Sequence, residues 1–255
     1  MRSILQFVPA PLFRLYLRIY WYIESLCNRR RSHQEIFTEI YNKKRWGCST
    51  ERPFFSGEGS VSPELAEPYI ALIQQYLSKF DFMPVVVDLG CGDFSIGKSL
   101  LPFCSRYIGV DVVPDLIEWL NSEKRSDKVE FHCLDITKDQ LPEGQVCLVR
   151  QVLQHLSNDD VKRVLVKLQK YSMVFITEHQ PSDRIMKVPN KDMVASGRNR
   201  VVFNSGVYPD KPPFKDSFKN IEVVQEFPGA GMGRLFDPGI IRTYLASNSS
   251  NINIP

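Results

Sequence analysis

Short runs of β-branched and aliphatic residues alternate with segments of helical spacing along the middle of the chain. The runs are too short for helices and are bounded by turn residues, which is typical of buried strands. Strands that alternate with helices favour a mostly parallel, doubly wound α/β sheet with helices on both faces. The predicted strands cover residues 84–89, 107–112, 129–134, 146–150 and 173–177, and the predicted helices cover residues 96–103, 114–122 and 158–170.

Helical spacing also precedes this alternation. Apolar residues recur at helical intervals over 33–46 and stop at Gly47, a residue that commonly ends helices. A second helix is predicted from Pro63 to about residue 79, because proline is favoured at the first helical position. The loop between the two helices, 47–62, is rich in Gly and Ser.

Beyond residue 178 the pattern becomes irregular. Residues 180–220 are polar and contain several prolines, whereas 221–227 read as a late strand. A turn is predicted at 229–233, and Leu235-Phe236 would begin another strand. The last dozen residues are rich in Ser and Asn and are predicted to form a frayed tail.

The first thirty residues are apolar and aromatic, but prolines and charges interrupt them. No run approaches the roughly 20 apolar residues of a membrane span, and the cleavage pattern of a secretory signal is missing. A helix from Pro11 would be amphipathic. Its narrow polar face would contain Arg14, Arg18, Ser25 and Arg29. One interpretation is peripheral membrane contact through residues 11–31, with weak binding to anionic liposomes. The other is a helix packed on the domain or in a dimer contact.

These patterns divide the chain into a helical N-terminal extension that is amphipathic and basic (1–35), an α/β domain (36–245) and a flexible tail (246–255). The composition, 43% hydrophobic and 24% charged, is ordinary for a globular domain. A net charge of +3 gives no general argument for a nucleic-acid partner. The six cysteines show no CxxC spacing and no accompanying His cluster, so no metal site is expected. A cytoplasmic location, with or without membrane contact, is the simpler interpretation.

A glycine-containing loop follows the first predicted strand, with the sequence Asp88-Leu-Gly-Cys-Gly-Asp93. In open α/β sheets, ligands bind beyond the carboxyl ends of the strands, where the strand order reverses. Glycine permits the tight turn and the close backbone approach that such a site needs. A nicotinamide-binding G-x-G-x-x-G pattern that starts at Gly90 would require a third glycine at Ser95, so the dehydrogenase interpretation fails there.

An acidic residue two positions before the first glycine resembles the first motif of the class I, Rossmann-like methyltransferases. The chain departs from that motif at Phe94, where the family has a third glycine. The resemblance implies that residues 36–245 form a class I methyltransferase domain with S-adenosylmethionine as its cofactor. It implies that Asp111 accepts the ribose hydroxyl protons and that Asp135 faces the adenine amino group. The residues that it places around the cofactor are Asp88, Gly90, Gly92, Asp111, Val112, Asp135, Ile136 and Gln151.

The stretch before the first strand resembles a narrower group of small-molecule and glycan-associated methyltransferases. Tyr41, the Trp46-Gly47 pair and the run Ser56-Gly57-Glu58-Gly59-Ser60 match the arrangement of that group. A Gly/Ser loop offers backbone donors to a carboxylate. Trp46, Ser56 and Gly57 would therefore lie over the methionine end of the cofactor as a lid. The alternative is a solvent loop that caps the next helix.

Transfer of a methyl group to oxygen usually needs a base. The candidates are His155, just after the fourth strand, and Glu178, at the end of the fifth. The alternatives are a packing or capping role for His155 and a solvated strand end for Glu178. The long segment 181–214 is basic, which could favour an anionic or sugar-acid acceptor, or could simply reflect a solvated loop. Its basic residues include Arg184, Lys187, Lys191, Arg198 and Arg200.

These observations favour an S-adenosylmethionine-dependent methyltransferase that acts on a small-molecule or glycan acceptor at oxygen. Two other classes stay open, namely a non-catalytic binding or scaffold protein with the same fold and an oxidoreductase with an adenine dinucleotide. The sequence identifies neither the acceptor nor the oligomeric state.

Overall fold

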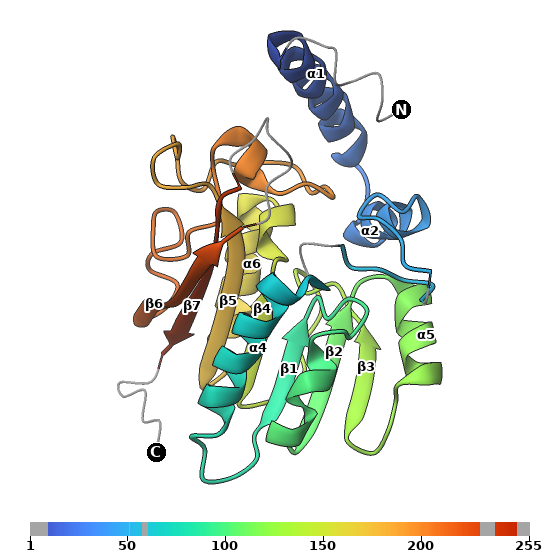
Figure 1. Ribbon diagram of the computed structural model, residues 1–255, viewed down its shortest axis with the longest axis vertical. Coiled ribbons are helices and arrows are strands. Elements are labelled where there is room, and N and C mark those ends of the chain that lie inside the picture. Colours follow the sequence, from blue (N-terminus) through green and yellow to red (C-terminus); the bar gives the residue numbers. More distant parts are fainter. Residues whose placement is uncertain (1–9, 51, 58–60, 230–237, 249–255) are drawn as a thin grey trace.

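Seven strands form a single sheet in the computed structural model, which describes residues 10–50, 52–57, 61–229 and 238–248 (Figure 1). The strand order is β3-β2-β1-β4-β5-β7-β6. Strands β1 to β5 pair in parallel, and β7 pairs antiparallel with both β5 and β6. The strands are β1 (Val85–Leu89), β2 (Arg106–Asp111), β3 (Val129–Cys133), β4 (Val146–Arg150), β5 (Met173–Gln180), β6 (Asn220–Pro228) and β7 (Ile240–Ser247). The order reverses between β1 and β4, so their carboxyl ends mark the expected ligand crevice.

Helices cover both faces of this sheet and bury one apolar core on each. The first core includes Val86 of β1, and the second includes Val87, because successive side chains of a strand point to opposite faces. The first core is covered by α4 (Pro63–Leu77), the 3₁₀ helix η2 (Gly97–Phe103) and α5 (Pro114–Glu123), and the second by α6 (Asn158–Leu168). The predicted doubly wound α/β class is confirmed.

The five predicted strands are confirmed, and β5 extends three residues further than its apolar run. The added residues Glu178, His179 and Gln180 are polar but buried. They continue the strand because β7 pairs with β5 along this whole stretch, up to the Gln180–Ile240 pair. The helix predicted over 96–103 is a 3₁₀ helix.

Strand β7 was not predicted, and it corrects the expected tail. Tyr244 and Leu245 are buried in the sheet, so the predicted frayed tail is wrong for these residues. The flexible tail assigned to 246–255 is also wrong at its start, because Ala246 and Ser247 belong to the buried end of β7. The strand predicted at Leu235-Phe236, most of the turn at 229–233 and residues 249–255 lie outside the described residues.

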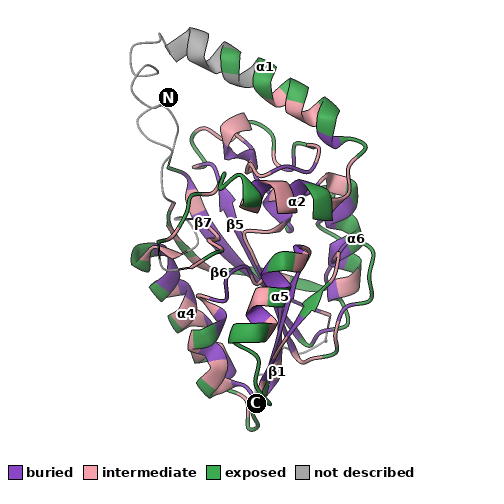
Figure 2. Ribbon diagram, turned by 90° about the vertical axis from the view of Figure 1, so that its right-hand side faces the viewer, coloured by how far each residue is buried: buried purple, intermediate pink, exposed green. Residues whose placement is uncertain are grey.

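Two helices precede this sheet, α1 (Ala10–Asn28) and α2 (His33–Asn42). Ser32 caps α2 through a reciprocal pair of hydrogen bonds with Glu35. The helix predicted over 33–46 ends at Asn42 and continues as a turn. Figures 1 and 2 show α1 apart from the sheet, beyond the carboxyl ends of the parallel strands. None of the described helices combines the length and apolarity needed to cross a bilayer.

The segment 181–219 is irregular, as predicted. Hydrogen bonds from buried polar side chains attach it to the domain. Asn190 donates to the carbonyl oxygen of Tyr208 at 2.9 Å and accepts from the Tyr208 amide at 2.7 Å. Arg200, fully buried in the short 3₁₀ helix η4 (Arg200–Phe203), donates to the carbonyl of Leu156 at 2.6 Å. The segment is therefore an ordered part of the domain.

Candidate active site

The chain turns sharply where β1 ends. Gly90 and Gly92 have φ angles of +76° and +55°, a region that glycine adopts without strain. The Gly90 amide donates to the Val110 carbonyl at 2.7 Å, which bends the loop back toward β2. Val152, which follows β4, packs against Gly90. A Cβ atom on residue 90 would lie only 2.3 Å from the Cγ2 atom of Val152. Phe94 stands where the family has a third glycine, and its φ angle is also positive, +63°.

Asp88 is buried beneath this loop. Its Oδ2 accepts a hydrogen bond of 2.5 Å from the Tyr107 hydroxyl of β2. Burial raises the pKa of Asp88 to about 6, although the Tyr107 hydrogen bond and the charge of Arg150 act in the opposite direction. Asp88 therefore connects β1 to β2 beneath the loop, and its contact with the cofactor stays a prediction.

Asp111, at the carboxyl end of β2, lies directly beside the glycine loop. Its Oδ2 accepts from the Gly92 amide at 3.3 Å and its Oδ1 from the Val113 amide at 3.2 Å. The Val112 amide is a third backbone donor, and because a carboxylate has about four acceptor positions, one is left for a donor from a ligand. Burial raises the pKa of Asp111 to about 6, against the effect of these backbone donors. This arrangement fits a ribose hydroxyl.

Asp135 lies two residues beyond the end of β3, and its carboxylate is occupied within the protein. Its Oδ2 is 3.0 Å from His33 Nδ1, and its Oδ1 accepts from the Thr137 hydroxyl at 2.7 Å. His33 Nε2 is also 3.4 Å from Asp160 Oδ2 at the start of α6. The imidazole therefore joins α2 to the domain through two carboxylates. Sequence reasoning did not select His33, because its partners are more than 100 residues away. A contact of Asp135 with adenine stays a prediction.

We expect His33 to make stability depend on pH. Burial lowers its pKa, but the hydrogen bonds and charges of Asp135 and Asp160 outweigh that effect and raise it to about 9. The pKa of histidine is about 6.5 in the unfolded chain and, for His33, about 9 in the folded protein. Protonated His33 therefore stabilises the fold fully below pH 6.5, and this stabilisation is lost as the pH rises through 9. Allowing for solvent screening, His33 should contribute about 2 kcal/mol below pH 6.5.

The measurement is urea unfolding of wild type and His33→Gln from pH 6 to pH 9.5. The difference in unfolding free energy should be largest at pH 6 and should disappear near pH 9.5. A difference that stays constant over this range would contradict the charged bridge.

Residues 41–57, here called the cover segment, lie against the glycine loop. Ser56 Oγ accepts from the Asp93 amide at 2.9 Å, and a Cβ at Gly92 would lie 2.2 Å from the same oxygen. The Tyr41 hydroxyl is 3.4 Å from Ser56 Oγ. Ser62, which begins the next helix, makes no side-chain capping bond. This packing supports the lid interpretation over a loop that only caps α4, whereas Glu58, Gly59 and Ser60 lie outside the described residues.

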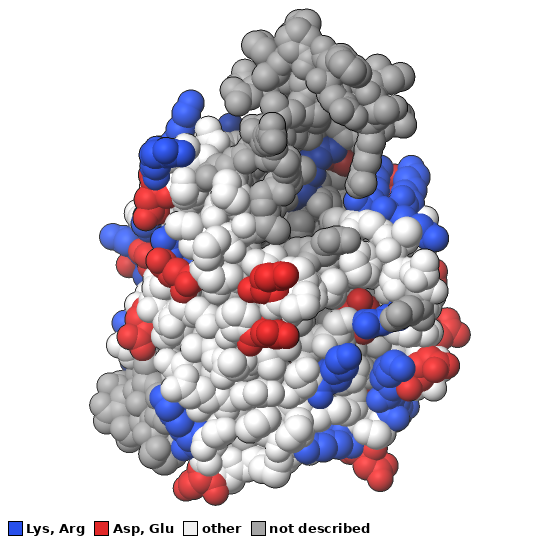
Figure 3. All heavy atoms as spheres, in the orientation of Figure 1, with Lys and Arg blue, Asp and Glu red and all other residues white. Residues whose placement is uncertain are grey.

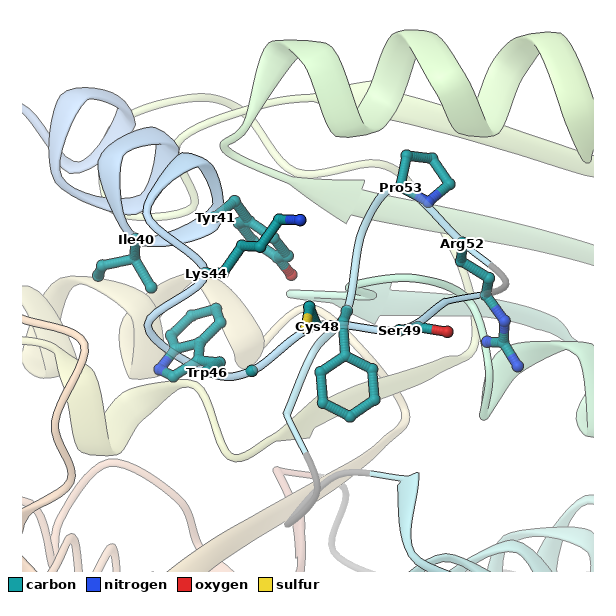
Figure 4. Close-up of a pocket in the computed structure, with 10 residues that line it drawn as sticks. Ile40, Tyr41, Lys44, Trp46, Cys48, Ser49, Arg52 and Pro53 are labelled. Carbon is teal, nitrogen blue, oxygen red and sulfur yellow. The ribbon is translucent and has the colours of Figure 1, made fainter. Parts of the chain in front are cut away.

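Trp46 is the aromatic centre of the cover segment. Its ring lies 5.2 Å from the ring of Tyr41 and 5.5 Å from that of His155, and its Nε1 donates to the Gly197 carbonyl at 2.9 Å. Gly57, with φ +94°, brings the backbone back against Trp46. A shallow pocket of about 70 Å³ lies beside this ring. Figure 4 shows the side chains that line it. Its lining comes from residues 40–55 alone and includes Tyr41, Lys44, Trp46, Ser49 and Arg52.

His155 lies in the 3₁₀ helix η3 (Leu153–His155) beneath Trp46. Its Nδ1 is 3.0 Å from the Arg198 carbonyl, so Nδ1 carries the proton and donates it. Its Nε2 is 3.3 Å from the side-chain amide nitrogen of Gln154, which donates to it. Burial lowers the pKa of His155 to about 4. The side chain is therefore neutral at physiological pH, and its role as a base stays a prediction.

Glu178 is fully buried in β5 and caps the turn after β4. Its two oxygens accept from the amides of Leu153 and Gln154, each at 2.9 Å. Burial raises its pKa to about 8, against these donors and the nearby charge of Arg200. A solvated strand end is therefore wrong. The carboxylate is bonded to the backbone, which does not favour the predicted catalytic role and points to a positioning role for η3.

The remaining predicted cofactor residues surround the same strand ends. Val112 follows Asp111 and is partly buried. Ile136 is buried in the second core, so its side chain packs inside the domain. Gln151 follows β4 with a φ of +57°, and its amide donates to the Thr177 carbonyl at 2.6 Å. Within the described ranges, no group of three or more His, Cys, Asp or Glu side chains could hold a metal ion.

The basic residues of segment 181–214 do not form a single surface. Arg200 is fully buried, and Arg198 forms an ion pair of 2.9 Å with Glu24 of α1. Both side chains are occupied by contacts within the protein. The basic segment is therefore neither a solvated loop nor an acceptor site at Arg198 and Arg200. Arg184, Lys187 and Lys191 are exposed.

Comparison with known proteins agrees with this geometry. Residues 86–171, from β1 through α6, match the family model described as a methyltransferase domain. No curated protein matches the chain by sequence.

Solved structures share the fold at low sequence identity. The YcgJ protein from Bacillus subtilis is 12% identical, with a TM-score of 0.53 over 72% of this chain and 100% of that one. The N-methyltransferase NodS from Bradyrhizobium japonicum, in complex with S-adenosyl-L-homocysteine, is 16% identical, with a TM-score of 0.50 over 73% and 89%. The bifunctional kinase-methyltransferase WbdD is 19% identical, with a TM-score of 0.51 over 72% of this chain and only 40% of that chain.

Residues 86–171 match a methyltransferase domain, and the strand order and the glycine loop agree with the class I methyltransferase resemblance found in the sequence. The NodS structure contains S-adenosyl-L-homocysteine, the product that S-adenosylmethionine leaves after it gives up its methyl group.

Proposed function

We propose that the protein transfers a methyl group from S-adenosylmethionine to a hydroxyl group of a small-molecule or glycan acceptor. The observation that carries this proposal is the buried carboxylate of Asp111 beside the Gly92 amide, at the point where the strand order reverses. A carboxylate next to a close-approach glycine suits the ribose and backbone contacts of an adenosyl ligand.

Each part of the site would have a separate task. Bound there, the cofactor supplies a methyl group on a positively charged sulfur. Asp111 would hold the ribose, and the glycine loop would let the ligand approach the backbone. The cover segment would exclude water and fix the reacting groups, since positioning provides much of the rate enhancement in a displacement. Asp135, oriented by His33, would lie on the adenine side.

The acceptor proposal rests on the pocket in the cover segment. Tyr41 and Trp46 offer aromatic faces and Lys44 offers positive charge, while Arg52 is paired with Asp93. This combination suits a small polar acceptor with acidic groups, such as a sugar acid. His155, in ring contact with Trp46, is our candidate for accepting the hydroxyl proton through Nε2 once the Gln154 amide moves aside. NodS is named an N-methyltransferase, so amines belong in the same acceptor screen.

Isothermal titration with S-adenosylmethionine, S-adenosylhomocysteine and NAD⁺ tests the cofactor part of the proposal. We expect binding of both sulfur ligands with dissociation constants of about 1 μM to 1 mM, and no binding of NAD⁺. Absence of S-adenosylmethionine binding, or tighter binding of NAD⁺, would overturn it in favour of a dinucleotide enzyme.

A radiolabelled-methyl screen tests the transfer part. Cell extracts and purified sugar acids, alcohols and amines would be incubated with the protein and labelled S-adenosylmethionine. We expect label in a hydroxyl-bearing small molecule or glycan. Cofactor binding without transfer to any acceptor would favour the non-catalytic binding protein.

A further inference from the structure

Helix α1 exposes an unusual concentration of large apolar side chains. Six of the eleven exposed large hydrophobic residues in the described part of the chain lie on it, with exposed fractions from 40% to 63%. They are Tyr16, Ile19, Tyr20, Tyr22, Ile23 and Leu26. At 100° per residue these six positions fall within one arc of about 160°. We call this set the apolar arc. The side chains of Arg14 and Arg18 lie outside the described residues.

The opposite side of α1 holds the helix on the domain. Glu24 forms ion pairs with Arg45 at 2.8 Å and with Arg198 at 2.9 Å. Asn28 Nδ2 donates to the Ala195 carbonyl at 3.0 Å. Trp21 lies edge-on to the ring of Phe203 at 5.0 Å.

The orientation of α1 is therefore the reverse of that of an ordinary packed helix, which turns its apolar face to the core. Here mainly polar contacts attach the helix. The apolar arc points away from the domain except at Tyr20, whose ring centroid lies 4.6 Å from the Arg198 guanidinium. Figure 2 shows α1 apart from the body of the molecule, with mostly exposed residues along its outer side. Helix α1 therefore does lie on the domain, but through its polar side and Trp21, and the alternative of a dimer contact through the apolar arc stays open.

The charges around the apolar arc are positive. Glu24 is the only acidic residue between residues 10 and 31, and its two ion pairs are internal to the protein. Arg29 and Arg30 follow the helix and are exposed. Figure 3 shows further Lys and Arg side chains at the level of α2. The outer surface of α1 therefore presents apolar and aromatic groups next to cationic groups.

We propose that α1 binds an anionic membrane surface, with the apolar arc inserted at the level of the lipid headgroups. Tyrosine is favoured at that depth because its ring is apolar and its hydroxyl is polar. Arginine beside the arc is attracted to anionic lipids. A second copy of the chain is a poorer occupant, because a stable protein interface involves about 20–30 residues on each side, many more than the arc contains. This proposal does not depend on the cofactor, so it and the proposed function can fail independently.

Flotation of the full chain with lipid vesicles tests the proposal. Vesicles of phosphatidylcholine alone would be compared with vesicles containing phosphatidylserine, at low and high salt. We expect binding to the anionic vesicles, weakened by salt. In the variant Ile19→Glu/Ile23→Glu, binding should fall at least about tenfold, because two inserted side chains become charged.

The matched control is Val166→Glu/Val223→Glu, which alters two exposed apolar residues elsewhere in the chain. It should bind vesicles like the wild type, and far-UV circular dichroism should show that both variants are folded. No binding by the wild type, or equal binding by the two variants, would overturn the proposal. So would a dimer in analytical ultracentrifugation that Ile19→Glu/Ile23→Glu dissociates, because the arc would then be covered by a second copy.

Discussion

Replacing Asp111 by alanine is expected to weaken S-adenosylmethionine binding at least about 100-fold. Each hydrogen bond from a ribose hydroxyl to the carboxylate would contribute roughly 1.5–3 kcal/mol, and a ribose offers two such hydroxyl donors. Asp111→Asn keeps the shape and one oxygen, so its affinity should be intermediate. The measurement is isothermal titration at pH 7.5.

The control for this prediction is Asp115→Ala, an exposed carboxylate four residues further along the chain. It should bind the cofactor like the wild type. The pH provides a second check on the wild type. Because burial raises the pKa of Asp111 to about 6, affinity should decline as the pH falls below 6, where the carboxyl becomes protonated. Equal affinities for Asp111→Ala and Asp115→Ala would remove Asp111 from the site.

Replacing Glu178 by alanine is expected to destabilise the protein by roughly 2–5 kcal/mol. The change leaves the buried amides of Leu153 and Gln154 without their acceptor, and each unpaired buried donor costs roughly 1–3 kcal/mol. Urea unfolding of the two proteins at pH 7 measures the effect.

Glu222→Ala, on the exposed edge strand β6, is the control and should change stability by no more than about 0.5 kcal/mol. Glu178→Ala also separates the two roles considered for this residue. A positioning role predicts a large loss of stability. Unchanged stability with a loss of methyl transfer would instead support the catalytic role predicted from the sequence.

The parallel half of the sheet could be predicted because its strands are buried on both faces. Runs such as Val85–Val87 are continuously apolar, and the acidic residues at the ends of these strands mark the edge where ligands bind. The same logic placed Asp88, Asp111 and Asp135 near one edge. What it could not provide was the partner of each carboxylate, because Tyr107 and His33 are distant in sequence and carry no local signal.

In the antiparallel edge, β6 was predicted from residues 221–227, whereas β7 was missed for a different reason. In β7, Arg242 and Thr243 divide the apolar positions into two short groups, and the Ser and Asn residues that follow are typical of a tail. These polar residues are buried because Arg242 donates to Gln180 Oε1 at 2.7 Å and Thr243 lies 3.0 Å from the hydroxyl of Thr177. Strand structure here depends on pairing between distant polar side chains, which periodicity does not reveal.

Four consecutive residues, Ala195 to Arg198, connect elements that have been described separately. They hold Asn28 and Glu24 of α1, the indole of Trp46 in the cover segment, and both the backbone and the imidazole of His155. A lipid surface bound to α1 and a cofactor bound beneath the cover segment, as proposed above, would therefore both act on the same short stretch of backbone. Coupling between two binding sites is reciprocal. If a lipid surface changes the affinity for the cofactor by some factor, the cofactor must change the affinity for that surface by the same factor.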